Sequence, residues 1–530
     1  MKTDVLILGG GVSAWAAAAE AVKAGVQVDL FCDGAGASPL IHGFCLPEGP
    51  GDSAELFYED TDRAGCGQGD PAIIRTLTEG AEELDGYLAE LGLQPDREEG
   101  ALRLLQPLGS RVPRVASVEN RTGPALLRAL RQRLNGNEKF TEHRGFRALE
   151  LIKRDGRVTG AKLYDRAQDR FISCTAAVIL LAVGGFSRLF PETTAPADLG
   201  GDGIAMAARA GASLVDMEFI QFEPCSAVAP EPLVGKSMIT TMFFEGAVLR
   251  NARGERFLLK YGPEGERIQK DVLSLRMAEE IISGGAGPHG GLFFDCTAVD
   301  EARMRGVYRP YLERYLAVGI DIRKTPFEVA PAAHTALGGV RITPDCRTDV
   351  PGLFACGEVT GGLHGANRLG GNAGTETVVF GRIAGKTAAE EVKRMAEAPE
   401  GTAEAARQAE GPRQMENVPP VLPIPALRER LKTALRSGLG VLRREDRTLS
   451  ALREVREMLA LPFSENSFEE LRFRNDLLTA RLSLTAALER KGSVGCHIRE
   501  DAVEEMEKYR LLLKLNGAEI TVKREPVPGR

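Results

Sequence analysis

Residues 4–14 of this 530-residue chain read DVLILGGGVSA, and the alanine-rich stretch WAAAAEA follows at 15–21. The short apolar run before the glycines predicts a fully buried parallel strand, and the stretch after them predicts a helix. A second apolar run, VQVDLF at 26–31, predicts another strand. Strand, glycine turn, helix and strand in this order are typical of a dinucleotide-binding unit.

The residues of the turn have separate predicted roles. Gly9 allows the tight turn, and Gly11 lets the backbone approach a pyrophosphate, which then lies on the positive end of the helix. Ala14 takes the place of a third glycine, where a small residue permits close packing of the helix on the strand. An acidic residue normally closes the second strand and binds ribose hydroxyls. Asp33, next to Cys32 and 24 positions after Gly9, is the better candidate.

The composition excludes several classes of function. A net charge of −7 argues against a nucleic-acid partner, because such a partner would require a basic stripe. The nine cysteines form no CxxC pair, so neither a zinc site nor the ligands of an iron–sulfur cluster are expected in this chain. A disulfide framework is also not expected at this length, which indicates a reducing cytoplasm.

The chain shows no pattern of a membrane segment. No signal peptide is expected, because the first residues lead directly into the strand that begins at Asp4. The longest apolar run, at 176–183, is far shorter than a membrane span. We therefore expect no direct membrane insertion, and contact with a membrane would require another subunit.

A second diagnostic stretch at residues 350–372 reads VPGLFACGEVTGGLHGANRLGGN. It resembles the flavoprotein subunits of succinate dehydrogenase and fumarate reductase and their relative L-aspartate oxidase. The resemblance implies FAD as cofactor, with Gly357 and Glu358 on its ribityl or ribose side and the HGANRL run against the isoalloxazine ring. It also implies that Gly371 and Asn372 open a helix whose N-terminus faces the flavin, where it would stabilise negative charge on the reduced ring.

Further matches to the same family follow in the expected order along the chain. The resemblance adds Gly184 and Gly185 to the cofactor site, at the end of a strand, and Asp202, at the start of a helix. The matching stretches are DTDRAG at 60–65, AVGGF at 182–186, GDGIAMA at 201–207, PAAHTALGGV at 331–340 and GCHIRED at 495–501.

The family pattern predicts an α/β fold with three domains. A Rossmann-like FAD-binding domain would be discontinuous and formed by residues 1–222 and 335–396. The insertion at 223–334 would be an α+β capping domain that closes over the substrate. Proline- and glutamate-rich sequence at 397–424 indicates a linker. Helical spacing of Leu, Arg, Glu and Ala then predicts a C-terminal helical domain at 425–530.

The resemblance also names candidates for substrate binding. In this family the flavin N5 exchanges hydride with a carbon next to a carboxylate, and an arginine of the capping domain moves the proton. His334 matches a histidine that binds a substrate carboxylate; the alternative is a buried structural histidine. Arg368 is retained as well, and a guanidinium suits bidentate binding of a carboxylate. The alternative for Arg368 is an ion pair with Glu358 or with a phosphate.

Three positions of the predicted active site depart from the family. Glu223 replaces a carboxylate-binding histidine, and Thr241 replaces a glutamate of the proton path. The position of the proton-carrying arginine holds Leu275, whereas Arg276 comes one residue late, which is a rotation of about 100° on a helix. Arg276 would serve as the proton carrier if the helix begins differently; an exposed helix arginine is an equally good interpretation.

The replacement by Glu223 changes which substrates are expected to bind. A carboxylate facing Glu223 would be repelled in a low-dielectric pocket, so succinate and fumarate are predicted to be poor substrates. A substrate with one carboxylate or carbonyl, and an amine, hydroxyl or apolar group at its other end, fits better. The leading prediction is an FAD-dependent oxidoreductase acting on CH–CH or CH–NH groups. The alternatives are an amine oxidase like L-aspartate oxidase and a flavin-carrying electron-transfer subunit without substrate chemistry of its own.

The sequence also bears on how FAD is attached and on the partners of the protein. FAD is expected to be non-covalent, because His42 matches the family's glutamine better than its flavin-linking histidine. Besides a small-molecule substrate, the resemblance implies an iron–sulfur or other electron-transfer subunit, since the flavin must exchange electrons with a partner. No second complete GxGxxG motif is present, so direct use of a nicotinamide cofactor is not indicated.

Overall fold

The computed structural model describes residues 2–397, 415–505 and 507–529, and its first elements follow the predicted order. Strand β1 lies in the middle of a mixed sheet, parallel to β2 on one side and to β10 on the other. Helix α1 follows the glycine turn. The bounds of these elements are β1 Lys2–Leu8, α1 Val12–Lys23, β2 Val28–Cys32 and β10 Arg170–Leu181.

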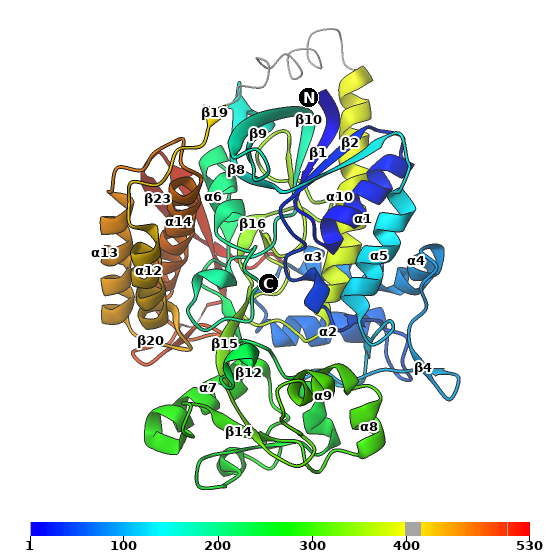
Figure 1. Ribbon diagram of the computed structural model, residues 1–530, viewed down its shortest axis with the longest axis vertical. Coiled ribbons are helices and arrows are strands. Elements are labelled where there is room, and N and C mark those ends of the chain that lie inside the picture. The colour runs from blue at the N-terminus through cyan, green and yellow to red at the C-terminus, as the bar shows by residue number, and fades with distance from the viewer. Residues whose placement is uncertain (1, 398–414, 506, 530) are drawn as a thin grey trace.

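The sheet continues in the order β7-β2-β1-β10-β9-β8, and β17 pairs in parallel with β10. Helices α1, α5 and α10 pack beside one another along the sheet (Figure 1). Small residues bring α1 and α10 together, since a Cβ on Gly385 would lie 2.2 Å from the backbone oxygen of Ala17. This arrangement confirms the predicted Rossmann-like α/β fold. The bounds are β7 Phe140–Arg144, β8 Phe146–Arg154, β9 Arg157–Asp165, β17 Leu353–Ala355, α5 Thr122–Leu134 and α10 Asn372–Glu397.

The capping region forms the lower end of the molecule in Figure 1 and combines a sheet with helices. Its four antiparallel strands have the order β12-β15-β14-β13. Because β12 pairs with β15, the chain leaves the main body and returns to it along neighbouring strands. The bounds are β12 Ile220–Ala227, η4 Thr240–Glu245, β13 Val248–Arg250, α7 Lys270–Glu280, β14 Leu292–Asp295, α8 Glu301–Arg305, α9 Arg309–Leu316 and β15 Phe327–Ala336.

The C-terminal region begins with three helices that pack side by side, at the left in Figure 1. The prediction of a helical domain over 425–530 does not hold for its last part, where β22 and β23 form an antiparallel hairpin that pairs with β11. The turn Asn516-Gly517 between these strands is a typical hairpin signal. The bounds are α12 Ile424–Leu439, α13 Glu445–Leu459, α14 Phe468–Glu489, β11 Leu214–Val215, β22 Tyr509–Asn516 and β23 Glu519–Pro526.

The predicted linker at 397–424 is described only in part, since 398–414 lie outside the described residues. Its end contributes β19, which pairs antiparallel with β10. The remaining elements are η1 Ser38–Leu40, β3 Phe44–Cys45, α2 Ala54–Ala64, α3 Pro71–Glu82, α4 Leu84–Glu90, β4 Arg97–Glu98, β5 Ala101–Leu102, β6 Val115–Ala116, η2 Ser187–Leu189, α6 Asp202–Ala210, η3 Glu231–Leu233, η5 Phe257–Lys260, η6 Ile281–Gly285, β16 Gly339–Arg341, β18 Thr360–Gly361, β19 Met415–Glu416, β20 Leu442–Arg443 and β21 Ile498–Arg499.

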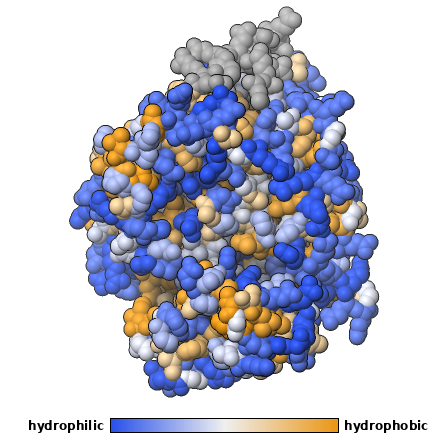
Figure 2. Space-filling view, in the orientation of Figure 1, coloured by the Kyte–Doolittle hydropathy of each residue, from blue (hydrophilic) through white to orange (hydrophobic). Residues whose placement is uncertain are grey.

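The surface seen in Figure 2 is mostly hydrophilic, with scattered apolar groups, several of which gather over the capping region at the lower end. On this face, polar and charged side chains interrupt the apolar groups. Within the described residues, no helix combines the length and the apolar character needed to cross a bilayer.

A buried carboxylate lies where the C-terminal hairpin meets the main body. Asp216 directly follows β11, is fully buried and has a left-handed backbone with φ of 62°. Arg510 of β22 lies 3.7 Å from its carboxylate and also pairs with Asp70 at 3.1 Å. In the described part of the chain, neither carboxylate oxygen of Asp216 has a hydrogen-bond partner. Burial raises the pKa of Asp216 to about 6.

We predict that Asp216→Asn stabilises the protein at neutral and alkaline pH. The folded pKa lies above the ordinary value of 3.8, so the folded state binds the extra proton, and wild-type stability falls as the pH rises from about 4 to about 6. At pH values above this range, the shift in pKa corresponds to a loss of about 2–3 kcal/mol in the free energy of unfolding. Asparagine also tolerates a left-handed backbone. Thermal unfolding should therefore show a gain in Tm that is larger at about pH 8 than at about pH 5.

The matched control is Asp155→Asn, because Asp155 is an exposed turn residue that also has a positive φ, of 46°. This variant should change the free energy of unfolding by no more than about 0.5 kcal/mol at either pH. A Tm for D216N at or below the wild-type value at the higher pH would contradict the prediction.

Candidate active site

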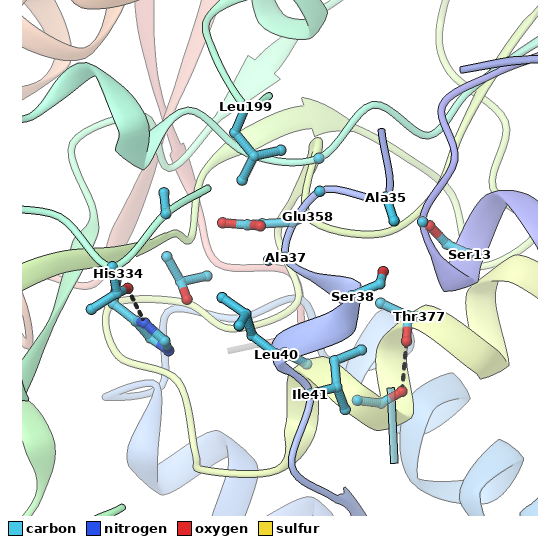
Figure 3. A pocket seen from close by; sticks show the side chains of 18 of the residues that line it. Ser13, Ala35, Ala37, Ser38, Leu40, Ile41, Leu199, His334, Glu358 and Thr377 are labelled. Atoms are coloured by element: carbon cyan, nitrogen blue, oxygen red, sulfur yellow. Dashed lines mark hydrogen bonds between the residues drawn. The ribbon is translucent and has the colours of Figure 1, made fainter. Parts of the chain in front are cut away.

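A long cavity lies where the carboxyl ends of β1, β2 and β10 meet, and it extends to the capping region. In open α/β sheets this edge is where ligands bind. Residues 9–11 line one end of the cavity, and His334 lines the other. Figure 3 shows the side chains of Glu358 and His334 pointing into it from different segments of the chain.

The glycine turn has the shape that a pyrophosphate requires. Gly9 has φ of 126°, and a Cβ at this position would lie 2.1 Å from the carbonyl oxygen of Ala182. Gly11 is the N-cap of α1, and the next backbone N–H, that of Val12, donates to the Ser38 hydroxyl at 2.9 Å. The positive end of α1 thus opens onto the cavity, where it would stabilise the phosphates of a dinucleotide.

Asp33 lies at the cavity wall directly after β2, as expected of a ribose-binding carboxylate. Arg166 pairs with Asp33 at 2.5 Å, and Arg147 lies 3.4 Å from it. Arg147 also holds Asp202, the first residue of α6, at 2.6 Å. No sequence motif marks Arg147, because it connects Asp33 and Asp202, which are distant from it in the sequence.

Glu358 is half-buried in the cavity wall. Burial raises the pKa of Glu358 to about 7, and the negative charge of Glu376 contributes to the shift. The backbone N–H of Ala336 donates to the carboxylate at 3.2 Å. Gly185 leaves room for this side chain, because a Cβ there would lie 2.3 Å from Glu358 Oε1. A carboxyl group that is partly protonated near neutral pH can both donate to and accept from a ribityl hydroxyl.

Helix α10 begins beside the cavity, as the glycine run before it predicts. Gly371 and Ala373 line the cavity at this helix end. The Asn372 side chain is turned away and donates to the Thr61 hydroxyl at 3.1 Å, so it supports the turn from behind. The positive end of α10 therefore faces the cavity, where it would favour the negative charge of a reduced flavin.

Three predicted substrate-binding residues meet at the end of the cavity next to the capping region. His334 Nδ1 lies 2.6 Å from the Thr194 hydroxyl, and its Nε2 lies 3.9 Å from the Glu223 carboxylate. Burial, together with the charges of Lys270 and Arg368, holds the pKa of His334 well below its ordinary value, so the ring is neutral. Arg368 is buried, and its Nε has no hydrogen-bond partner among the residues that the structure describes.

The structure does not bring Arg276 into the cavity. Its guanidinium pairs with Glu279 at 2.8 Å and lies 4.2 Å from the ring centre of Tyr261. Lys270, the first residue of α7, lines the cavity instead, and its Nζ lies 2.5 Å from the Glu223 carboxylate. Sequence reasoning missed Lys270 because it considered only arginines as proton carriers, although the basic residue at the head of this helix was a usable signal.

The predicted site residues fall into three groups. The cavity wall includes Gly9, Gly11, Asp33, Gly184, Asp202, Glu223, Thr241, His334, Glu358, Arg368 and Gly371. Four more do not line the cavity but are adjacent in sequence to residues that do: Ala14, Gly185, Gly357 and Asn372. Arg276 lies outside. Over residues 2–397, 415–505 and 507–529, no group of three or more His, Cys, Asp or Glu is arranged to hold a metal ion.

The cavity brings together the glycine turn, Asp33 at the end of β2 and the N-terminus of α10. These features define an FAD-binding protein. The FAD binding domain family matches residues 4–373. One subunit of the fumarate reductase (CoM/CoB) of Methanothermobacter marburgensis is 34% identical over 536 residues, which cover 97% of each chain. L-aspartate oxidase of Caulobacter vibrioides is 32% identical over 511 residues, which cover 94% of this chain and 93% of that protein.

Among solved structures, the quinol fumarate reductase FrdA of E. coli shares the fold with a TM-score of 0.89 at 24% identity, over 99% of this chain and 97% of that chain. The chain therefore belongs to the FAD-dependent oxidoreductases that comprise the succinate dehydrogenase and fumarate reductase flavoproteins and L-aspartate oxidase. The predicted family, the FAD cofactor and the class of enzyme are confirmed.

We predict that Gly9→Ala abolishes FAD binding, because the new methyl group would collide with the Ala182 carbonyl and force the turn out of shape. The purified variant should lack the visible absorbance of flavin. The control is Gly86→Ala on α4, where an added Cβ has nothing within 4 Å. That variant should retain wild-type flavin content; normal FAD occupancy in G9A would show that the turn does not hold the cofactor.

Proposed function

We propose that this enzyme interconverts a carbon–carbon double bond and the corresponding single bond next to a carboxylate, with fumarate and succinate as the first candidates. The observation that carries the proposal is the meeting of Arg368, neutral His334 and Lys270 at the capped end of the cavity. The guanidinium of Arg368 supplies a positive charge and the neutral ring supplies a hydrogen-bond donor, which suits an anionic carboxylate substrate. The similarity to one subunit of a fumarate reductase supports the same choice.

The sequence-based objection to fumarate rested on a Glu223 that would repel a carboxylate. Lys270 removes the basis for that objection, since its ammonium group lies 2.5 Å from the Glu223 carboxylate. An ion pair at this distance largely cancels the field of the glutamate in a low-dielectric site. The positive charge of Arg368 then remains available to a substrate.

The residues have distinct proposed roles. FAD supplies hydride exchange at its N5 when it is bound. The Thr194 hydroxyl lies 2.6 Å from Nδ1 of His334. In the proposed tautomer it donates to Nδ1, which leaves the Nε2–H free to hydrogen-bond a substrate carboxylate. Arg368 binds a carboxylate through its guanidinium. Lys270 Nζ gives a proton to the carbon beside the one that receives hydride, and the Glu223 carboxylate holds this ammonium group in place.

Fumarate reduction with a reduced viologen dye as electron donor tests the proposal. We predict that Lys270→Met lowers kcat by at least about 100-fold, since general acids contribute on this scale. The control, Arg276→Ala, should keep kcat within about twofold, because Arg276 lies outside the cavity. Absence of fumarate and succinate turnover by the wild type would refute the proposed substrates, and oxygen-dependent oxidation of L-aspartate would favour the amine oxidase alternative.

We also propose that an electron-transfer subunit works with this chain. The flavin must gain or lose electrons during each cycle, and within the described residues no metal-binding group is present to carry them further. The fumarate reductase relative from Methanothermobacter marburgensis, which matches nearly the whole chain, is itself named as one subunit of its enzyme. An iron–sulfur protein is the kind of partner that fits this requirement.

We also propose that FAD is bound non-covalently. His42, the histidine nearest the expected linking position, is part of the cavity wall, and burial lowers its pKa to about 4. We predict that acid or heat denaturation releases all flavin into the supernatant. Flavin that stays with the precipitated chain would show a covalent link, and His42→Gln would then identify or exclude this residue as its attachment point.

A further inference from the structure

A chain of polar contacts leads from the cavity through the capping region to the surface. Thr241, at the cavity wall, lies 3.5 Å from the hydroxyl of Tyr308. The Tyr308 hydroxyl donates to Glu245 Oε1 at 2.8 Å. Arg303 of α8 donates to both oxygens of this carboxylate, at 2.5 Å to Oε1 and at 2.8 Å to Oε2. The contacts join η4, α8 and the residue that caps α9.

The side chains at the outer end of this row of polar contacts are more exposed than those at the inner end, as a path to solvent requires. Tyr308 is fully buried and Thr241 is 7% exposed, whereas the side chains of Glu245 and Arg303 are 22% and 29% exposed. The inner end therefore faces the cavity, and the outer end reaches water. Arg303 also contacts Glu98 of the main body at 3.3 Å, which holds the outer end next to β4.

The direction of the hydrogen bonds follows from the groups involved. Burial acts to raise the pKa of Glu245, but hydrogen bonds from Arg303 and Tyr308 outweigh it and hold the pKa below its ordinary value. Glu245 is therefore ionised and can only accept hydrogen bonds. Tyr308 uses its one proton for Glu245, so Thr241 must donate to Tyr308. The oxygen lone pairs of Thr241 are then left for a donor in the cavity.

We propose that Thr241, Tyr308 and Glu245 form a proton relay between the substrate cavity and solvent. The inference rests on the proposed function, in which one proton accompanies each hydride. During reduction, the Lys270 ammonium group loses a proton to the substrate carbon. A solvent proton enters at Glu245, and the hydroxyls of Tyr308 and Thr241 turn toward the cavity. The Glu245 proton then moves to the Tyr308 oxygen as the Tyr308 proton moves to Thr241, and the Thr241 proton restores Lys270, which lines the same cavity.

The same path releases one proton during oxidation, and this outward direction matches the resting order of donors and acceptors. No other bond changes along the path, so one proton that enters corresponds to one proton delivered. The contact of 3.5 Å between Thr241 and Tyr308 is long for an O–H···O bond. Catalytic hydrogen bonds are often long without substrate and shorten in the complex, which is the state in which the relay operates.

A neighbouring tyrosine supplies a matched control. Tyr315 of α9 is also buried, at 1% exposure, and its hydroxyl has no hydrogen-bond partner in the described part of the chain. Its ring packs against Phe327 at a centroid distance of 4.3 Å. Tyr308→Phe and Tyr315→Phe therefore remove the same atom from two buried rings of the capping region, and only the first change interrupts the relay.

The experiment compares both variants and Glu245→Gln in the full chain with FAD bound. Turnover of fumarate is measured with a reduced viologen dye in water and in deuterium oxide. Reoxidation of the reduced flavin by ferricyanide is measured separately, because that reaction delivers no proton to carbon. We expect Y308F and E245Q to lower kcat at least about tenfold and to increase the solvent isotope effect. Their KM and ferricyanide rates, and every rate of Y315F, should stay within about twofold.

Two kinds of result with Y308F would contradict the proton relay. Wild-type kcat and isotope effect in Y308F would refute the relay, and so would a parallel loss of the ferricyanide reaction or of bound flavin, which indicates a structural role. If the wild-type enzyme turns over neither fumarate nor succinate, the proposed function fails first, and the relay that rests on it is rejected with it.

Discussion

The close approach of the β1–α1 turn to the end of β10 is the constraint on which the site depends. At Gly9 the backbone passes so near the Ala182 carbonyl that no side chain fits. Parallel pairing of β1 with β2 and β10 brings the carboxyl ends of these strands together at the same edge of the sheet. The glycine turn and Asp33 line the cavity at this edge. From this edge the cavity continues toward the beginning of α10 and the capping region.

Charge balance governs the opposite end of the cavity. Glu223 alone would oppose an anionic substrate, but Lys270 pairs with it, and burial keeps His334 neutral. Arg368 is then the cation of this group without a close carboxylate partner among the described residues, and its Nε is unpaired there. A buried guanidinium in this state gains more from a bound carboxylate than from any contact that the described chain itself supplies.

The sequence predicted the features that depend on neighbouring residues and missed those that depend on distant contacts. The turn at Gly9 follows from a local pattern, whereas the strand end at Glu358 and the order of domains were implied by the resemblance to the family. The choice between Lys270 and Arg276 follows from neither, because it depends on where α7 begins relative to the cavity. The C-terminal hairpin was missed because the Leu-rich strand β22 also fits helical spacing. Tyr308 carries no motif and gains its role only through Thr241 and Glu245.

The replacement at Thr241 and the position of Glu245 are consistent with one electrostatic requirement. A carboxylate at position 241 would add a second negative charge to a cavity end that already holds Glu223. Lys270 pairs with Glu223, so the second carboxylate would take up the positive charge of Arg368 that is left for a substrate. A neutral hydroxyl avoids this cost. The carboxylate of the proposed relay lies instead at Glu245, where Arg303 balances its charge and water reaches it. The cavity thus exchanges protons with solvent through neutral hydroxyl groups, and the charged end of the path stays outside the substrate's field.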